Sequence, residues 1–166
     1  MPGRPSSETV AGAGKTLDSV WGRRLARWLR RHQVFSVLDR HGPADAELCD
    51  WTGGGCRVLA ETLLPLLNRE FPGWSFALKV VASEDCPAEH VVVQVRDPRG
   101  RMRYIDGDGV STEKTLLRRL AVEVTSNVCL SDYDPATLNE WEIQSPPIKR
   151  ALLAELFETA FAEGDL

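Results

Sequence analysis

Apolar and polar residues recur along the chain with two different periods, and the change of period divides the sequence into parts. Apolar side chains return at steps of three and four between residues 16 and 40, and again from about Cys56 to a turn at 71–73. Such steps place them on one face of an α-helix. We therefore predict two amphipathic helices, separated by a loop over residues 41–55 that is rich in helix breakers.

The middle of the chain changes to a period of two, which is typical of β-strands. This alternation predicts three strands, and the sequence DPRG between the last two is expected to form a hairpin turn. After the strands the three- and four-residue steps return, and they predict further helices. The expected strands are 74–83, 90–96 and 101–106, and the expected helices are 111–124, 135–141 and 148–161.

This order of elements predicts an α+β fold, with N-terminal and C-terminal helices packed on a small antiparallel sheet. Residues 1–15 are rich in Pro, Gly, Ser and Ala, so we expect them to form a disordered N-terminal tail. Residues 16–166 have the length of one ordinary domain. A single α+β domain is therefore expected over residues 16–166.

Composition and charge narrow the class of partner. The 166 residues are 43% hydrophobic and 27% charged, with a formal net charge of −4. These values are typical of a globular protein in water, and the mildly acidic balance gives no reason to expect a nucleic acid as partner. No apolar run reaches the roughly 18 residues that would cross a membrane. We expect a cytoplasmic protein with a protein or peptide substrate, binding neither nucleic acid nor membrane.

Four cysteines, at positions 49, 56, 86 and 129, are the first candidates for chemistry. In a reducing cytosol they need no disulfides, and a cysteine is most often a small buried apolar residue. We expect that structural role for Cys49 and Cys129. Cys56 differs, because it follows three glycines and begins an apolar helix. Free N–H groups and partial positive charge at a helix N-terminus favour the thiolate form of a cysteine.

His90 and Asp106 are predicted to lie close together at one end of the sheet. His90 is the first residue of its strand and Asp106 is the last residue of the next, so a hairpin places these two ends side by side. An aspartate that orients an imidazole, and an imidazole that activates a thiol, form a catalytic triad. We predict that Cys56 is the nucleophile, that His90 is the base and acid, and that Asp106 or alternatively Asp108 orients the ring.

The loop before Cys56 holds the candidates for binding a substrate carbonyl. Gly55 has no side chain, so a substrate is expected to approach the backbone closely at this position. The N–H of Cys56 is one candidate donor to the oxyanion of a tetrahedral intermediate, and the Trp51 indole N–H is another. This chemistry requires no cofactor and no metal.

The three motifs DWTGGGC, EHVVV and YIDGDG, in that order, resemble those of papain-like and transglutaminase-like cysteine enzymes. The likeness covers roughly residues 48–112. The spacing from Cys56 to His90 is short, at 34 residues. In this spacing the chain is more similar to transglutaminase cores, arylamine N-acetyltransferases and papain-fold toxin deamidases than to papain. The resemblance implies a papain-like core and a thiol-dependent hydrolase or acyl transferase acting on an amide bond, as a protease, a deamidase or a transglutaminase-like enzyme. One departure is Asp50, because papain-like proteases carry a glutamine near this position as an oxyanion donor.

Two other hypotheses compete with this enzyme. Cys49, Cys56, Cys86 and His90 are a conceivable zinc ligand set, although structural zinc normally has a close pair of cysteines, and the sequence has no CxxC motif. The second alternative is a non-catalytic adaptor that binds a partner through the basic face of its first helix. That face carries Arg23, Arg24, Arg27, Arg30 and Arg31.

Overall fold

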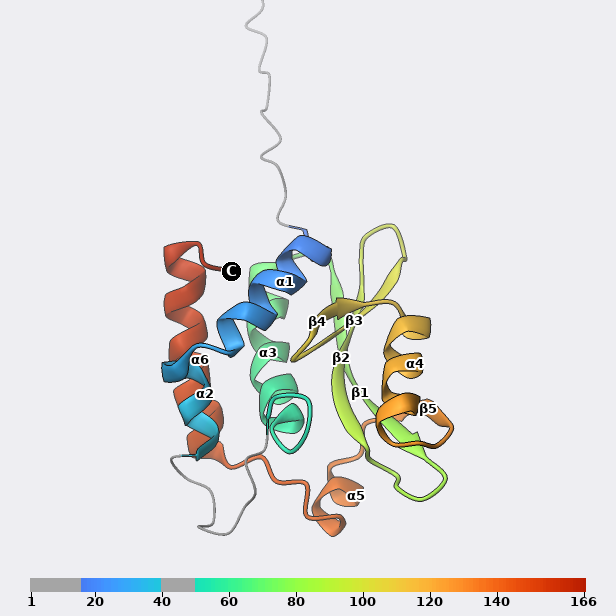
Figure 1. The fold of residues 1–166 in the computed structure, drawn as a ribbon. Coiled ribbons are helices and arrows are strands. Elements are labelled where there is room, and N and C mark those ends of the chain that lie inside the picture. The colour runs from blue at the N-terminus through green and yellow to red at the C-terminus, as the bar shows by residue number, and fades with distance from the viewer. Residues whose placement is uncertain (1–15, 40–49) are drawn as a thin grey trace, which may run out of the picture.

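Six helices and five strands make up the part of the chain that this computed structural model describes, residues 16–39 and 50–166 (Figure 1). They confirm the α+β class. The tail predicted for residues 1–15 and the structural role predicted for Cys49 lie outside the described residues, and the single domain over 16–166 stays a prediction. In chain order the elements are α1 (Ser19–Leu29), α2 (His32–Asp39), α3 (Cys56–Glu70), β1 (Ser75–Ser83), β2 (His90–Arg96), β3 (Met102–Asp106), β4 (Gly109–Ser111), α4 (Glu113–Glu123), β5 (Val128–Asp132), α5 (Pro135–Glu140) and α6 (Pro147–Glu163).

The single helix predicted over residues 16–40 was wrong, because the structure has two helices there, α1 and α2. The chain turns at Arg30, whose N–H donates to the carbonyl of Trp28. Helix α1 packs on β4, whereas α2 packs on α6. The contact with α6 begins at the end of α1, where Trp28 stacks on Phe157 with ring centroids 4.4 Å apart, and α2 continues it after the turn. One straight helix cannot follow both surfaces, so tertiary packing overrides the continuous helical pattern.

Helix α3 begins at Cys56 and ends at Glu70, as its apolar steps predict. It turns a leucine-rich face to the core, and the most buried of these side chains are Leu59, Leu63 and Leu67. Gly55 occupies the N-cap position, where it has no side chain to accept from the first N–H groups. The positive end of the helix dipole is therefore not offset by a capping side chain.

The five strands form one antiparallel sheet in the order β4-β3-β2-β1-β5. The predicted hairpin joins β2 to β3, and in the turn the N–H of Asp97 donates to the Arg101 carbonyl at 3.0 Å. Strands β4 and β5 had not been predicted. Each is short, and each lies at an edge of the sheet, where few buried apolar side chains mark it.

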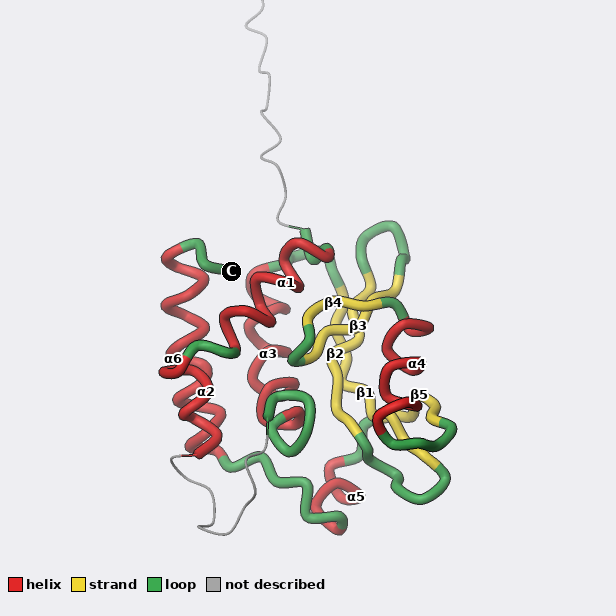
Figure 2. Tube along the Cα trace, viewed as in Figure 1, coloured by secondary structure: helices red, strands yellow, loops and turns green. Residues whose placement is uncertain are grey.

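Helices cover the two faces of the sheet unequally (Figure 2). Helices α1, α2, α3 and α6 lie on one side, and α4 lies on the other (Figure 1). The larger core cluster joins these four helices to inward valines of β2, whereas Leu116 and Leu120 of α4 pack on Val81, Val92 and Tyr104. No helix in the described ranges is long and apolar enough to cross a membrane.

Helix α1 approaches β4 so closely that only glycine fits at the contact. A Cβ atom on Gly22 would lie 2.4 Å from the backbone nitrogen of Val110. Gly109 has a φ of 111°, and a Cβ atom there would lie 2.6 Å from the Gly22 carbonyl oxygen. This contact fixes α1 against the turn that follows β3, and that turn contains Asp108.

Candidate active site

Cys56 is the first residue of α3 and lies in the core, with 4% of its surface exposed. Its backbone N–H donates to the carbonyl of Gly53 at 3.1 Å. The thiol therefore sits at the positive end of the helix dipole, where negative charge is favoured. Little of its surface is open to solvent.

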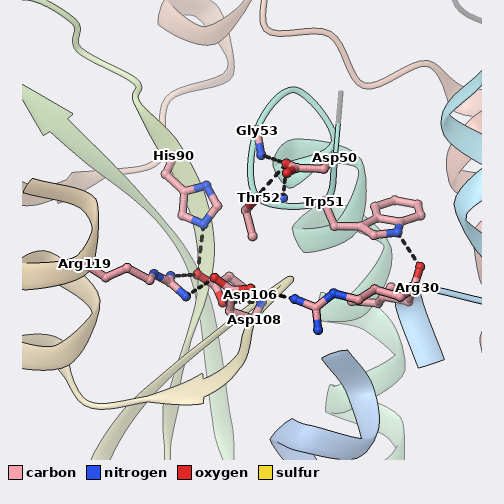
Figure 3. Close-up of polar contacts among 10 residues, drawn as sticks. Arg30, Asp50, Trp51, Thr52, Gly53, His90, Asp106, Asp108 and Arg119 are labelled. Carbon is pink, nitrogen blue, oxygen red and sulfur yellow. Dashed lines mark hydrogen bonds and ion pairs between the residues drawn. The ribbon is translucent and has the colours of Figure 1, made fainter. Parts of the chain in front are cut away.

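The turn before Cys56 is organised by the carboxylate of Asp50 (Figure 3). One oxygen of this carboxylate accepts from the Thr52 backbone N–H at 3.0 Å, from the Thr52 hydroxyl at 2.9 Å and from the Gly53 N–H at 2.5 Å. Burial alone would raise the pKa of Asp50, but these hydrogen bonds outweigh it and lower the pKa. Asp50 thus accepts hydrogen bonds that shape the loop, and it donates none to a substrate.

His90 is the first residue of β2, and its side chain is fully buried. Its Nε2 atom donates to Asp106 Oδ2 at 3.0 Å. Its Nδ1 atom makes no hydrogen bond of ordinary geometry with the described residues, although the ring interacts with the Cys56 thiol. Burial alone would lower the pKa of His90, but Asp106 and Cys56 together raise the pKa to about 10. The geometry therefore favours a charged ring.

Asp106, and not Asp108, is in contact with His90. Val93 pairs with Ile105, which puts Asp106 diagonally across from His90 on the same face of the sheet. Burial would raise the pKa of Asp106, but its hydrogen bond with His90 and the charges of His90 and Arg119 hold the pKa below its usual value. Asp108 instead forms ion pairs with Arg30 and Arg119 (Figure 3).

The three predicted triad residues thus come together from three elements. Cys56 comes from α3, which covers one face of the sheet, and His90 and Asp106 come from neighbouring strands. The interaction of His90 with Cys56 on one side and with Asp106 on the other forms a continuous chain of polar groups. Such a chain has the parts needed to activate a thiol for nucleophilic attack.

Comparison with protein-family models, with curated proteins and with solved structures finds no match for this chain. The likeness to papain-like and transglutaminase-like enzymes therefore rests on the sequence motifs alone.

Two residues that were predicted to help bind the substrate carbonyl, Trp51 and Gly55, make other contacts in the structure. The Trp51 indole N–H donates to the Leu29 carbonyl at 2.8 Å in the buried interior, so it is not available to a substrate. Gly55 is buried, and a Cβ atom there would lie 2.7 Å from the Asp50 carbonyl and 2.9 Å from Leu38. The missing side chain makes room for the protein's own loop rather than for a substrate. These contacts were not predicted, because the sequence does not reveal how tightly this loop folds on itself.

The structure places two of the other three cysteines, and their positions bear on the zinc hypothesis. Cys129 was expected to be buried, but it is exposed because it lies on the edge strand β5. Cys86 is half-buried in the turn between β1 and β2. Among residues 16–39 and 50–166 there is no group of three or more His, Cys, Asp or Glu side chains that could hold a metal ion. Cys49, the fourth ligand of the zinc hypothesis, lies outside these ranges.

Two arginines near the candidate site were not found from the sequence. Arg119 of α4 contacts Asp106, and Arg57 of α3 is buried beside Cys56. One signal existed for Arg119, because it stands between Leu116 and Leu120 on the buried side of its helix, where a charge is rare. One partner of Arg57, Glu61, lies one helical turn away, but Tyr133 and Asn139 lie more than 70 residues away along the chain, where no periodicity reveals them.

The raised pKa of His90 predicts that the protein loses stability in alkaline solution. A folded-state pKa of about 10, above the ordinary 6.5, means that the folded protein keeps a proton that the unfolded chain has lost. This contribution is complete below pH 6.5 and disappears as the pH rises through 10. We expect the free energy of unfolding in urea to fall by roughly 1–2 kcal/mol between pH 8.5 and pH 10 through this group; at lower pH a proton that the unfolded chain holds on Cys56, and that the proposed thiolate lacks, offsets the effect.

The His90→Gln variant should show a much smaller loss over the same range of pH. The matched control is His32→Gln, which changes an exposed histidine at the start of α2 and should behave like the wild type. Equal losses of stability in the wild type and in His90→Gln would contradict the prediction.

Proposed function

We propose that this protein is a thiol-dependent enzyme that cleaves an amide bond, with Cys56 as nucleophile, His90 as proton carrier and Asp106 as the residue that orients the ring. The observation that carries the proposal is the state of His90. Its ring is fully buried, its Nε2 is bound to Asp106, and its Nδ1 lacks an ordinary hydrogen bond while the ring interacts with Cys56. A buried imidazole in a purely structural role normally has both nitrogens paired.

In the first step the Cys56 thiolate attacks the carbonyl carbon of the amide, and the carbonyl oxygen becomes an oxyanion. Support for this oxyanion comes from the positive end of the α3 dipole, because the Cys56 N–H itself is bonded to the Gly53 carbonyl. The protonated His90 then gives its proton to the leaving nitrogen. The C–N bond breaks, an amine or ammonia leaves, and the acyl group remains on Cys56 as a thioester.

In the second step water or an amine attacks the thioester. Once Cys56 is acylated, its negative charge is gone, and with it one of the causes that raise the pKa of His90. The neutral ring then removes a proton from the attacking group, and Cys56 leaves as a thiolate. Asp106 stays ionised and hydrogen-bonded to Nε2 throughout, which holds the ring in one orientation.

We also propose that the fold is a papain-like or transglutaminase-like core. A cysteine at the N-terminus of a helix packs beside an antiparallel sheet, and two adjacent strands of that sheet carry the histidine and the aspartate. The substrate class is a protein or peptide amide, and we place the enzyme in the cytoplasm, where its thiols remain reduced. Deamidation of a glutamine side chain and cleavage of a peptide bond are the two forms of hydrolysis that this chemistry serves.

The adaptor hypothesis gains no support from the basic helix. Arg24 donates to the carbonyls of Gly164 and Asp165, Arg31 forms an ion pair with Asp165, and Arg30 forms one with Asp108. Three of the five arginines proposed as a docking surface are therefore occupied by the protein's own chain.

The proposal is tested with p-nitrophenyl acetate, a small activated ester that acylates nucleophilic thiols. We expect one acetyl group per chain, located on Cys56 by peptide mass mapping, and its slow release by water. Cys56→Ser should abolish this acylation, and Cys86→Ser should leave it intact. Failure of Cys56 to acquire the acetyl group in the folded protein would refute the proposed function.

A second measurement separates the two forms of hydrolysis. Casein is incubated with the wild type and with Cys56→Ser, and released ammonia and new α-amino groups are quantified. Ammonia alone indicates a deamidase, and new amino groups indicate a protease. Incorporation of an added primary amine indicates acyl transfer.

A further inference from the structure

The carboxylate of Asp106 is held by more than its hydrogen bond with His90. Its Oδ2 atom accepts both from His90 Nε2 at 3.0 Å and from the guanidinium of Arg119 (Figure 3). Its Oδ1 atom accepts from the backbone N–H of Asp108 at 2.9 Å. Both oxygens are thus occupied, and the carboxylate has no freedom to rotate away from the ring.

Arg119 reaches Asp106 from the face of the sheet opposite to Cys56. It lies on α4, and the same guanidinium also pairs with Asp108 Oδ2 at 2.5 Å. Asp108 in turn pairs with Arg30, which caps α1, at 3.2 Å. The guanidinium is therefore fixed by two carboxylates, one at each terminal nitrogen, which suits its fork of donors.

Stability alone explains Arg119 poorly. Its side chain is 27% exposed, and its Nε–H is buried without a hydrogen-bond partner among the described residues. A half-buried cation with an unpaired donor is unfavourable compared with an apolar residue at the same position. The position lies between two buried leucines, where an apolar side chain would extend the packing of α4.

We propose that Arg119 is a positioning residue of the candidate site, which locks the Asp106 carboxylate toward His90 and takes up part of its negative charge. The inference rests on the proposed function and deepens it. If Asp106 faced His90 alone, the full carboxylate charge would bind the ring proton too firmly for transfer to a leaving nitrogen. A guanidinium on the same oxygen weakens this hold, because two cations then share one anion.

The proton affinity of His90 depends on a small set of neighbours. Cys56 and Asp106 raise it, and Asp50 interacts with the ring from the loop before α3. Arg119 acts on it through Asp106. The remaining charged groups nearby have other partners: Glu89 with Ser83 in the β1–β2 turn, Lys79 of β1 with Asp132, and Arg57 of α3 with Glu61.

The test measures the titration of the His90 ring by NMR, with the signal assigned by its absence in His90→Gln. Arg119→Met and Arg119→Gln both remove the charge, so either one suffices if the other fails to fold. Each should raise the midpoint pH of His90 by roughly one unit, since removal of a like charge within a few ångströms favours the protonated ring. Arg119→Lys keeps the charge and should bring the midpoint back toward that of the wild type.

The matched control is Arg118→Gln, which changes the exposed neighbour on the same helix and should leave the midpoint unchanged. An unchanged midpoint in the folded Arg119→Met or Arg119→Gln protein overturns the inference. The acetylation of Cys56 is measured on the same samples. If the wild type is acetylated but the midpoint does not move, only the role of Arg119 fails. If the midpoint moves but the wild type is not acetylated, the proposed function fails instead.

Discussion

Replacement of His90 by alanine is expected to convert Cys56 into an ordinary thiol. Its rate of alkylation at pH 6, relative to its rate at pH 8.5, should fall roughly 100-fold. Under the proposed mechanism, Cys56 attacks as a thiolate stabilised by the protonated His90 ring. The rate of alkylation by iodoacetamide should then differ little between pH 6 and pH 8.5. In His90→Ala the rate should rise steeply over the same interval.

The size of this effect follows from the titration of an unperturbed cysteine. A thiol with the ordinary pKa of about 8.5 is about 0.3% ionised at pH 6 and about half ionised at pH 8.5, a ratio of roughly 150. The ratio of rates at the two pH values is the useful quantity, because Cys56 is only 4% exposed and slow access affects both rates equally. Peptide mass mapping separates Cys56 from Cys86 and Cys129, which serve as internal references.

The two aspartates provide the matched comparison for this experiment. Asp106→Asn should shift the onset of Cys56 alkylation to higher pH, because the charged ring loses its anionic partner. Asp108→Asn should shift it much less, since Asp108 pairs with Arg30 and Arg119 rather than with the ring. A steep pH dependence already present in the wild type would show that His90 does not activate Cys56.

The parts of the site that could be predicted from the sequence depend on local patterns. The apolar steps of α3 place its start at Cys56, and the alternation of β2 and β3 with the DPRG turn fixes a hairpin. Once those two facts hold, the ends of the two strands must meet, and His90 and Asp106 come together. The choice between Asp106 and Asp108 needed the structure, because β3 ends at Asp106 and the turn to β4 carries Asp108 away from His90, toward Arg30 and Arg119.

The parts that could not be predicted depend on contacts between distant segments. The break between α1 and α2 arises because each helix packs on a different partner, β4 or α6. The Trp51 indole N–H is taken by Leu29, more than 20 residues earlier in the chain. Such pairings leave no periodic trace, so a side chain that looked free to bind a substrate proved to be part of the interior.

Arg57 presents the largest expected loss of stability, and it follows from one such distant contact. Its side chain is only 8% exposed and pairs with Glu61 at 3.0 Å. It also donates to the Tyr133 hydroxyl at 3.2 Å, to Asn139 Oδ1 at 2.8 Å and to the Ile143 carbonyl at 2.7 Å. These hydrogen bonds from one guanidinium link the segment around α5 to the first turn of α3.

Arg57→Ala should lower the free energy of unfolding by about 3 kcal/mol, because it leaves the half-buried Glu61 carboxylate short of one partner and a backbone carbonyl without a donor. Arg150, which also pairs with Glu61, should prevent a larger loss. The control is Arg69→Ala on the same helix, whose ion pairs with Glu70 and Glu158 are at the surface. Water replaces such pairs readily, so this variant should unfold at nearly the same urea concentration as the wild type. Equal losses in the two variants would mean that the buried network contributes no more than the exposed one, and that α5 is held to α3 by apolar contacts instead.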